Sequence, residues 1–496
     1  MTHSYVEREL KFDVAADFVV PDVSALLPAG GCLERSVEQL RSDYFDTADH
    51  ALLRAKMTLR RRTGTTDTGW QLKVPQKPFR EEIRLSLDGD GGDGVPDEGV
   101  PDELRDLLLG AVRRQPLVQV ASVVTDRSVQ RLLDAEGRQL AEIDDDRVHA
   151  SAAGEAATAS SWREVEVELA DVEVQLLDAL AKRLRRAGAR PANSSSKLAR
   201  ALPADRIEPV TRRRRLRAGD VVSAYIAEQQ RVILAGDLAL RRGDDSVIHK
   251  TRVATRRLRS TLRCFSPLFH TGRAQSLDSE LRWFAGLLGE VRDRQVLAKR
   301  LDGMAQALPD TLTLGPVRAR IDTELRQEQT EHWNTLRAEL NGDRYLTLLQ
   351  DLADWVEQPP ATSKAHSRAK LIAKLVRRAE RKVARRLRRA NTTGDVHQLH
   401  GARKAAKRAR YAAEAAEPVI GGGASARQAK RYQKLQDLLG EHQDSLISAS
   451  VLRRLGAAAG VTDGENGFAF GILYEREAEN ARAAREKARR KAKKYS

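Results

Sequence analysis

Apolar and polar residues follow two different patterns along the chain, which change near residue 205. Before it, short segments rich in alternating apolar and charged residues are separated by Gly, Asp and Pro, which is typical of strands joined by turns. The pattern predicts strands at residues 6–14, 57–62, 69–74, 80–87, 124–134, 138–148 and 162–170, and helices near 20–28, 102–114 and 172–188. Antiparallel strands in such a series favour a sandwich or a barrel.

After residue 216 the apolar residues recur with the helical period of 3.6 and strand signals almost vanish. This pattern predicts helices at residues 219–242, 245–270, 274–302, 316–340, 343–356, 364–390, 395–417, 424–459 and 464–493. Turn-like breaks fall at 358–363, 391–395 and 421–425. The second half is therefore expected to be an all-helical bundle.

The helical half contains an internal repeat. HKTRVATRRLR begins at His249 and HGARKAAKRAR begins at His400, an offset of 151 residues. LLGEVRD ends at Asp293 and LLGEHQD ends at Asp444, with the same offset. Two similar helical bundles related by duplication are expected.

Composition limits the protein class. The 496 residues suggest about two to four domains, and 41% hydrophobic content is enough for buried cores. The two cysteines, Cys32 and Cys264, exclude a disulfide framework and a cysteine-rich zinc site. Because no apolar run approaches the ~20 residues that span a bilayer and the N-terminus resembles no signal peptide, we expect a cytoplasmic protein without a membrane anchor.

The net charge of +16 is unevenly distributed. Residues 1–205 contain 28 Lys and Arg against 36 Asp and Glu, a balance of −8, whereas the remainder contains 58 against 34, a balance of +24. A strongly basic half favours a polyanionic partner. The alternative is that the basic helices merely present solvated faces.

Charged residues gather on single faces of the predicted strands. Glu7, Glu9 and Lys11 share one face because strand side chains alternate. The same reasoning groups Arg60 with Arg62, Arg80 with Glu82 and Arg84, and Glu164 with Glu166 and Glu168. A solvated sheet face is the simpler interpretation, but in a closed barrel these faces would meet inside. The acids could then hold a hard divalent cation and the bases could bind phosphate oxygens.

The order and spacing of seven motifs resemble the CYTH domain of the triphosphate tunnel metalloenzymes. They are VERELKF at 6–12, YFDT at 44–47 followed by LRRR at 59–62, WQLKV at 70–74, REEIRLSL at 80–87, EIDDDRV at 142–148, REVEVEL at 163–169 and SSKLARAL at 195–202. Two departures, at Arg61 and Arg84, leave the strand register open by one position.

This resemblance implies an eight-stranded antiparallel tunnel over residues 1–205 that binds a triphosphate and usually hydrolyses it with Mg²⁺ or Mn²⁺. It assigns catalytic roles to Glu9, Lys11 and Lys73. The implied metal ligands are Glu7, Glu9, Asp144, Glu164, Glu166 and Glu168. The implied triphosphate-binding residues are Lys11, Arg60, Arg62, Lys73, Arg84, Arg127 and Lys197.

Basic residues form stripes on the predicted helices. His249, Arg252, Arg256 and Arg259 lie on one face of a helix, and His400, Arg403, Lys407 and Arg410 repeat the stripe. A third stripe includes Lys370, Lys374 and Arg377. Parallel basic stripes would repel one another without an anion between them.

These stripes, with LLGEVRDRQVL at 287–297 and LQDLLGEHQDSLI at 435–447, resemble the CHAD domain, which is commonly fused to CYTH. The resemblance implies that residues 219–496, after a basic linker at 206–218, bind inorganic polyphosphate in a channel between the two bundles. The three stripes would line it. The overall expectation is an α+β protein: an antiparallel barrel followed by a duplicated all-α bundle.

Other interpretations of the basic half are less favourable. The two histidines with Asp293 or Asp444 could coordinate a cation, but the surrounding Arg and Lys would repel it. The run Arg212–Arg215 and the segment at 487–494 could contact nucleic acid, which we expect to be nonspecific because aromatic residues make up 4% of the chain.

Three functions are compatible with the motifs. The first is a metal-dependent triphosphatase that acts on inorganic tripolyphosphate or a related triphosphate and also binds polyphosphate. The second is a non-catalytic protein that binds polyphosphate and localises to its granules, with an idle tunnel. The third is an adenylate cyclase, since some CYTH proteins make cyclic AMP. The sequence leaves the substrate, the metal and the oligomeric state open.

Overall fold

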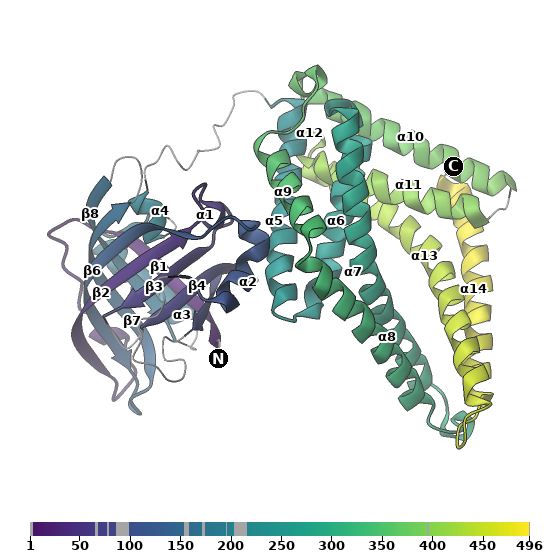
Figure 1. Ribbon diagram of the computed structural model, residues 1–496, viewed down its shortest axis with the longest axis horizontal. Helices are drawn as coiled ribbons and strands as arrows, with labels where there is room; N and C mark the ends of the chain where they lie inside the picture. The colour runs from purple at the N-terminus through teal and green to yellow at the C-terminus, as the bar shows by residue number, and fades with distance from the viewer. Residues whose placement is uncertain are drawn as a thin grey trace. The chain divides into compact units, whose positions relative to one another are not determined.

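The computed structural model describes residues 3–64, 68–76, 79–85, 99–152, 158–170, 174–194, 196–202, 216–393 and 396–495. The chain divides into two compact units, residues 1–211 and 212–496, here called the N-terminal unit and the helical unit (Figure 1). The linker expected at 206–218 lies largely outside the described residues, as does the run Arg212–Arg215.

The N-terminal unit is built on one antiparallel sheet. Its strands are β1 (His3–Asp13), β2 (Cys32–Asp46), β3 (Thr58–Thr63), β4 (Gly69–Gln76), β5 (Phe79–Leu85), β6 (Val118–Leu133), β7 (Gln139–Ala152), β8 (Thr158–Leu169) and β9 (Arg190–Pro191). Its α-helices are α1 (Ala51–Arg54), α2 (Asp102–Val112), α3 (Val174–Arg186) and α4 (Lys197–Ala201).

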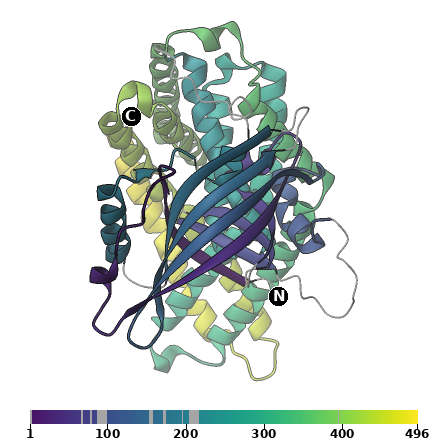
Figure 2. The ribbon, with the colours of Figure 1, turned by 90° about the vertical axis from the view of Figure 1, so that its left-hand side faces the viewer.

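The strand order is β5-β4-β3-β2-β6-β7-β8-β1-β9. β1 pairs with β8 through residues 8–13 and with β5 through residues 3–7, so it lies between them. The sheet thus has nine strands where eight were expected, because the two-residue β9 pairs with the end of β1. Figure 2 shows the strands running side by side with a strong common twist.

The two faces of the sheet differ in polarity. One face of β7 and β8 carries buried apolar side chains, among them Ile143, Val165 and Val167, which belong to one core with Leu180 and Leu184 of α3. The alternate residues of the same strands are acidic and face the other way. The apolar face therefore packs against α3, and the charged face is turned away from this helix.

Two sequence predictions in this unit were wrong. β2 was not predicted, because its first half is largely exposed and even Val37 is 81% exposed, so it has no alternating apolar signal. The helix expected near 20–28 is a single 3₁₀ turn at Ser24–Leu26. Tertiary packing, rather than local periodicity, decides both segments.

The helical unit contains α5 (Ala218–Arg241), α6 (Ile248–Cys264), α7 (Thr271–Gln306), α8 (Val317–Leu340), α9 (Asp343–Glu357), α10 (Lys370–Thr393), α11 (Val396–Ala415), α12 (Glu417–Ile420), α13 (Gly422–Ala459) and α14 (Phe468–Tyr495). Among the residues described, no helix combines the length and apolar character needed to cross a bilayer.

The internal repeat is visible in the order of packing. α5, α6, α7 and α8 pack in succession, and α10, α11, α13 and α14 do the same (Figure 1). α6 also packs on α11, the helix that carries the equivalent basic stripe. A second junction joins the far ends of the repeats, where Leu301 and Leu325 share a core with Leu452 and Phe470.

Candidate functional site

The register of the strands brings charged residues of the N-terminal unit into rows. Glu166 of β8 lies opposite Lys11 of β1 on one side and Asp144 of β7 on the other. The next row joins Glu164 to Asp146, which in turn lies opposite Arg127 of β6. Because paired residues in a sheet point to the same face, the rows collect acids and bases on one surface.

Lys197 connects these rows from outside the sheet. It is the first residue of α4, which begins there because the side chain of Ser196 accepts a hydrogen bond from the amide of Ala199. The ammonium of Lys197 lies 2.9 Å from Asp146 Oδ2, 2.7 Å from Glu164 Oε1 and 2.8 Å from Glu166 Oε1.

Arg127 and Lys11 neutralise the same acids. Arg127 donates two hydrogen bonds of 2.7 Å to Asp146 and also pairs with Asp144. Lys11 lies 2.5 Å from Glu166 Oε1 and 3.1 Å from Glu9 Oε2. The acids and bases at this end are mutually paired, as buried charges must be.

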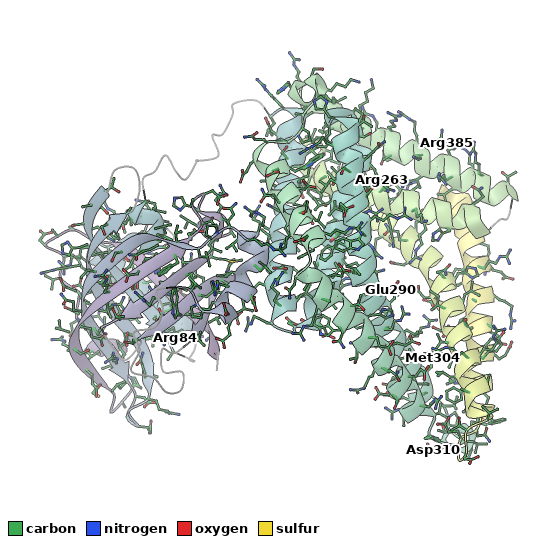
Figure 3. The ribbon with its side chains drawn as sticks, in the orientation of Figure 1. Arg84, Arg263, Glu290, Met304, Asp310 and Arg385 are labelled. Carbon is green, nitrogen blue, oxygen red and sulfur yellow. The ribbon has the colours of Figure 1, made fainter. Side chains whose placement is uncertain are left out.

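Basic residues predominate on β3, β4 and β5, which form the part of the cavity here called the basic end. Arg60 donates to Gln71 at 2.7 Å, and Lys73 and Arg84 both contact Glu82, at 3.3 and 2.5 Å. Arg62 is also buried here. One carboxylate, Glu82, therefore stands among Arg60, Arg62, Lys73 and Arg84 (Figure 3 labels Arg84).

The shifts in side-chain pKa also differ between the acidic residues and the basic end. Burial alone would raise the pKa of Glu166, but Lys11, Lys197 and Arg127 hold that pKa well below its usual range. At the basic end, burial beside Arg60 and Arg127 lowers the pKa of Arg62 to about 10. The acidic end thus has negative charge stabilised by cations, whereas the basic end has cations that repel one another and would be stabilised by an anion.

Most of the predicted residues line one cavity. Eleven of them do so: Glu9, Lys11, Arg60, Arg62, Lys73, Arg84, Arg127, Asp144, Glu166, Glu168 and Lys197. Glu164 does not line it but contacts Lys197 from behind the lining. The side chain of Glu7 lies outside the described residues, although its backbone pairs opposite Arg80.

The sequence reasoning missed three acids of this cavity region: Asp146, Glu82 and Glu142. Glu142 and Asp146 each lie two residues from Asp144 on β7, so strand alternation places these three acids of EIDDD on one face. Glu82 was placed on the face of Arg80 and Arg84, but was given no role. Tyr44 was also missed, and its hydroxyl accepts a 3.4 Å hydrogen bond from Arg60.

The acidic end fits a hard divalent cation. Asp146, Glu164 and Glu166 each offer a carboxylate oxygen, and these atoms lie within 4.8 Å of one another. Oδ1 of the buried Asp144 accepts no hydrogen bond from any described residue. Oxygen-only ligands suit Mg²⁺ or Mn²⁺ rather than metals that prefer nitrogen or sulfur.

The helical unit contains a basic cleft of about 740 Å³ between the two repeats. Seven predicted residues line it: His249, Arg252, Arg256, Arg259, His400, Arg403 and Lys407. Six further cationic residues that line it were not among the predicted polyphosphate-binding residues: Arg263, Arg282, Arg292, Arg300, Lys404 and Arg408. The first of these, Arg263, is labelled in Figure 3.

Two carboxylates also line the cleft. Asp293 accepts hydrogen bonds of 2.7 and 3.2 Å from Arg252, and Asp444 occupies the equivalent position in the second repeat. Asp278, outside the lining, accepts from Arg259 and Arg263. Asp293 and Asp278 are thus salt-bridge partners that orient arginines, the role that the sequence favoured for Asp293 over a metal site.

Cations in the cleft lower one another's pKa. Burial, with Arg256, Arg403 and Arg252 nearby, lowers the pKa of Lys407 to about 7. Burial and Arg252 lower the pKa of Arg256 to about 10. The cleft therefore concentrates uncompensated positive charge and favours an anion.

Four predicted residues lie outside the lining of this cleft. Arg410 donates instead to Glu414 at 2.9 Å. Lys370, Lys374 and Arg377 are exposed on α10. Figure 3 shows Arg385 of the same helix projecting outward. α10 instead contributes Arg378 and Lys382 to a separate pocket beside the end of α6.

Both units of the chain match known domain families. The CYTH domain model matches residues 6–201, and the CHAD domain model matches residues 224–453. The chain belongs to the CYTH–CHAD family. CYTH domains are generally metal-dependent triphosphatases or cyclases.

Relatives of the whole chain exist in Mycobacterium tuberculosis. The uncharacterized proteins MT2285 of strain CDC 1551 and Rv2226 of strain H37Rv are each 38% identical over 502 residues, covering 97% of this chain and 94% of theirs. The two-domain arrangement is therefore shared over nearly the full length.

Solved structures resemble single domains. PptA from Streptomyces chartreusis is 21% identical and covers 56% of this chain and all of its own, with a TM-score of 0.48. The CHAD domain of the plant Ricinus communis is 21% identical and covers 55% of this chain and 92% of its own, with a TM-score of 0.44. HpAC1 from Hippeastrum, described as a putative adenylyl cyclase with a dominant triphosphatase activity, is 16% identical and covers 39% of this chain and 93% of its own, with a TM-score of 0.21.

Proposed function

We propose that the CYTH domain is a divalent-metal-dependent triphosphatase whose substrate is inorganic tripolyphosphate or a related triphosphate, bound inside a closed tunnel of eight strands. The observation that carries this proposal is the polarity of the interior. Acids that suit a metal stand at one end, and Arg60, Arg62, Lys73 and Arg84 gather at the other with Glu82 as their shared carboxylate. Phosphoryl transfer to water needs both sets on one substrate.

The basic end would bind the phosphate oxygens. Arginine offers paired N–H donors that match phosphate geometry, and each lysine supplies a point charge. Arg60 is held by Gln71 and Tyr44, so its guanidinium is already oriented before substrate arrives. Lys11 and Lys73 would contact the phosphate nearest the acids, where charge builds up during bond cleavage.

Glu9 would orient the attacking water. Burial alone would raise its pKa, but Lys11 and Lys73 lower it, so the carboxylate is ionised at neutral pH and can accept a hydrogen bond from water. Asp146, Glu164 and Glu166 would hold Mg²⁺ or Mn²⁺, beside Asp144 and Glu168 of the cavity lining. Such an ion would supply Lewis-acid stabilisation of the negative charge that develops on the leaving group.

The deciding experiment measures phosphate release from tripolyphosphate, ATP, thiamine triphosphate and long-chain polyphosphate, with Mg²⁺, Mn²⁺ or chelator. We expect chelator-sensitive turnover of tripolyphosphate that Glu9→Gln abolishes. The matched control is Asp126→Asn, which changes an exposed carboxylate on β6 that bonds to Gln39. Full turnover by a folded Glu9→Gln protein would contradict the proposal, and cyclic AMP from ATP would favour a cyclase.

We further propose that the CHAD domain binds inorganic polyphosphate in its basic cleft. Thirteen residues that line the cleft are Arg, Lys or His, whereas two, Asp293 and Asp444, are acidic. A linear polyanion would relieve this repulsion along its length. The test is the affinity of the full chain for long-chain polyphosphate against ionic strength, which should fall steeply as salt rises. A variant with Arg256 and Arg403 both changed to Gln should bind weakly.

A second candidate is binding without catalysis. It is favoured by the mutual pairing of the tunnel's charges, which leaves a cavity of about 70 Å³, against about 740 Å³ in the CHAD cleft. Polyphosphate binding with no turnover of any triphosphate would establish it. Association with polyphosphate granules in the cell would then be the function to test.

A further inference from the structure

The ammonium of Lys197 occupies a position suited to a cation. It lies within 2.9 Å of one oxygen from each of Asp146, Glu164 and Glu166, and these three carboxylates form the group that could hold a metal ion. Its side chain is 7% exposed. The ammonium of Lys197 thus contacts the same three carboxylates that could hold a divalent cation.

The surroundings have more negative charge than Lys197 neutralises. In order along the chain, the acids linked by ion pairs at this end are Glu9, Asp13, Asp144, Asp146, Glu164 and Glu166. Their basic partners are Lys11, Arg127, Lys197 and Arg200, which leaves a formal charge of −2 among these described residues. In addition, Oδ1 of Asp144 is buried without a hydrogen-bond donor among the described residues. Both observations point to a further positive charge.

The helix itself does not favour a lysine at this position. Lys197 begins α4, and a cation at a helix N-terminus is disfavoured by the helix dipole. Leu198, Ala201 and Leu202 anchor α4 in an apolar core with β6 and β7. The short helix is therefore fixed by its apolar residues, while the flexible stem of Lys197 can move its charge without moving the helix.

We propose that Lys197 and a divalent cation compete for the Asp146–Glu164–Glu166 group, and that metal binding releases Lys197 to contact the phosphate. The inference rests on the proposed function and extends it. A divalent ion has twice the charge of an ammonium and takes several oxygen ligands at once, so it can displace Lys197. Since Lys197 also lines the tunnel with Lys11 and Lys73, its released charge adds to the phosphate-binding set. Metal loading would thereby prepare the tunnel for its anion.

The first test measures Mn²⁺ binding to the full chain by calorimetry, with no triphosphate present. We expect Lys197→Met to bind Mn²⁺ at least about tenfold more tightly than the wild type, because the competing cation is gone. The control is Arg138→Met, whose removed side chain is 76% exposed and pairs with Asp134 and Glu136 rather than with the three carboxylates, so it should change affinity by less than about twofold. Equal or weaker Mn²⁺ binding by folded Lys197→Met would overturn the proposal.

A second measurement uses the wild type, so it stands even if Lys197→Met fails to fold. Trace acetylation followed by mass spectrometry reports how accessible each lysine amine is. Mg²⁺ should increase modification of Lys197 severalfold, while Lys56, outside the tunnel lining, should not change. Unchanged or reduced modification of Lys197 would overturn the inference. If both tests succeed but tripolyphosphate is not hydrolysed, the proposed activity fails and the cation exchange stands.

Discussion

Gly289 of α7 leaves the space in which the guanidinium of Arg252 lies. A Cβ at Gly289 would be 3.0 Å from Arg252 Nη2, and a Cβ at Gly440 of α13 would be 2.9 Å from Arg403 Nη2. One turn beyond Gly289, Asp293 accepts hydrogen bonds from the same Arg252. In both repeats the glycine of the LLGE motif thus leaves room for one arginine that lines the cleft, and in the first repeat Asp293 also holds that arginine.

Changing both glycines to alanine should therefore weaken polyphosphate binding. The added methyl groups would push Arg252 and Arg403 from their positions, and we expect affinity to fall severalfold while helix content is retained. Fluorescence anisotropy with labelled polyphosphate would measure it. Gly286→Ala is the control, because its Cβ would meet nothing within 4 Å. That variant should keep its affinity and gain about 0.5–1 kcal/mol from helix propensity. Equal affinities in both variants would contradict this role.

Polyphosphate affinity should depend on pH through Lys407. Burial beside Arg256 and Arg403 lowers its pKa to about 7, so the free amine is largely neutral at pH 8.5. A bound polyanion favours the ammonium and raises this pKa, so binding takes up a proton above pH 7. Affinity should drop about tenfold from pH 6 to 8.5, the effect of one charge-assisted hydrogen bond.

Lys407→Arg provides the comparison, because a guanidinium stays charged over this range. Its affinity, measured at constant ionic strength, should vary much less with pH. His249 contributes at lower pH, since burial and Arg292 lower its pKa below the ordinary 6.5. A wild-type affinity that is the same at pH 6 and 8.5 would contradict the prediction.

The sequence was most informative where side-chain periodicity follows chemistry. The alternation of Glu9 with Lys11 and of Glu164 with Glu166 placed these residues on one face, and the register confirms that Lys11 lies opposite Glu166. Periodicity could not show that Lys197, about 30 residues beyond β8, returns to the same acids. That contact depends on how α4 packs.

The basic stripes show a different limit. Arg259 lines the cleft, but its repeat equivalent Arg410 does not. The reason lies one turn further on, where the first repeat has Arg263 and the second has Glu414, which binds Arg410. Considering the residue at i+4 together with the stripe would have predicted that Arg410, unlike Arg259, forms an ion pair within its own helix.

Glu82 should stabilise the tunnel before substrate binds. It is 1% exposed and contacts Lys73 and Arg84, so Glu82→Gln leaves their charges without their shared carboxylate. We expect a loss of about 3–5 kcal/mol in unfolding free energy. Tripolyphosphate should raise the melting temperature of this variant by more than it raises that of the wild type, because the anion replaces the missing negative charge.

Its control is Glu81→Gln, which alters the opposite face of β5 and should cost under about 1 kcal/mol. The pH dependence gives a further check. Burial would raise the pKa of Glu82, but Lys73, Arg60 and Arg84 hold it well below its usual range. Its contribution is thus present above about pH 4.5 and lost on acidification, so the gap between wild type and Glu82→Gln should narrow at low pH. A difference in unfolding free energy that stays the same at every pH would show that the ionised Glu82 carboxylate is not what stabilises the wild type.

Arg300 should stabilise the junction of the two repeats. From α7 it donates hydrogen bonds of 3.1 and 2.8 Å to Glu477 of α14, and others to Glu441 and Ser445 of α13. Because Glu477 is 1% exposed, Arg300→Met leaves its carboxylate buried and unpaired. Thermal and denaturant unfolding should show a loss of about 3–5 kcal/mol. Arg454→Met removes a pair of similar geometry to Glu324 and Glu328, but its arginine is 48% exposed, so it should cost less than about 1 kcal/mol. Equal losses in the two variants would show that burial of Glu477 does not determine the strength of this junction.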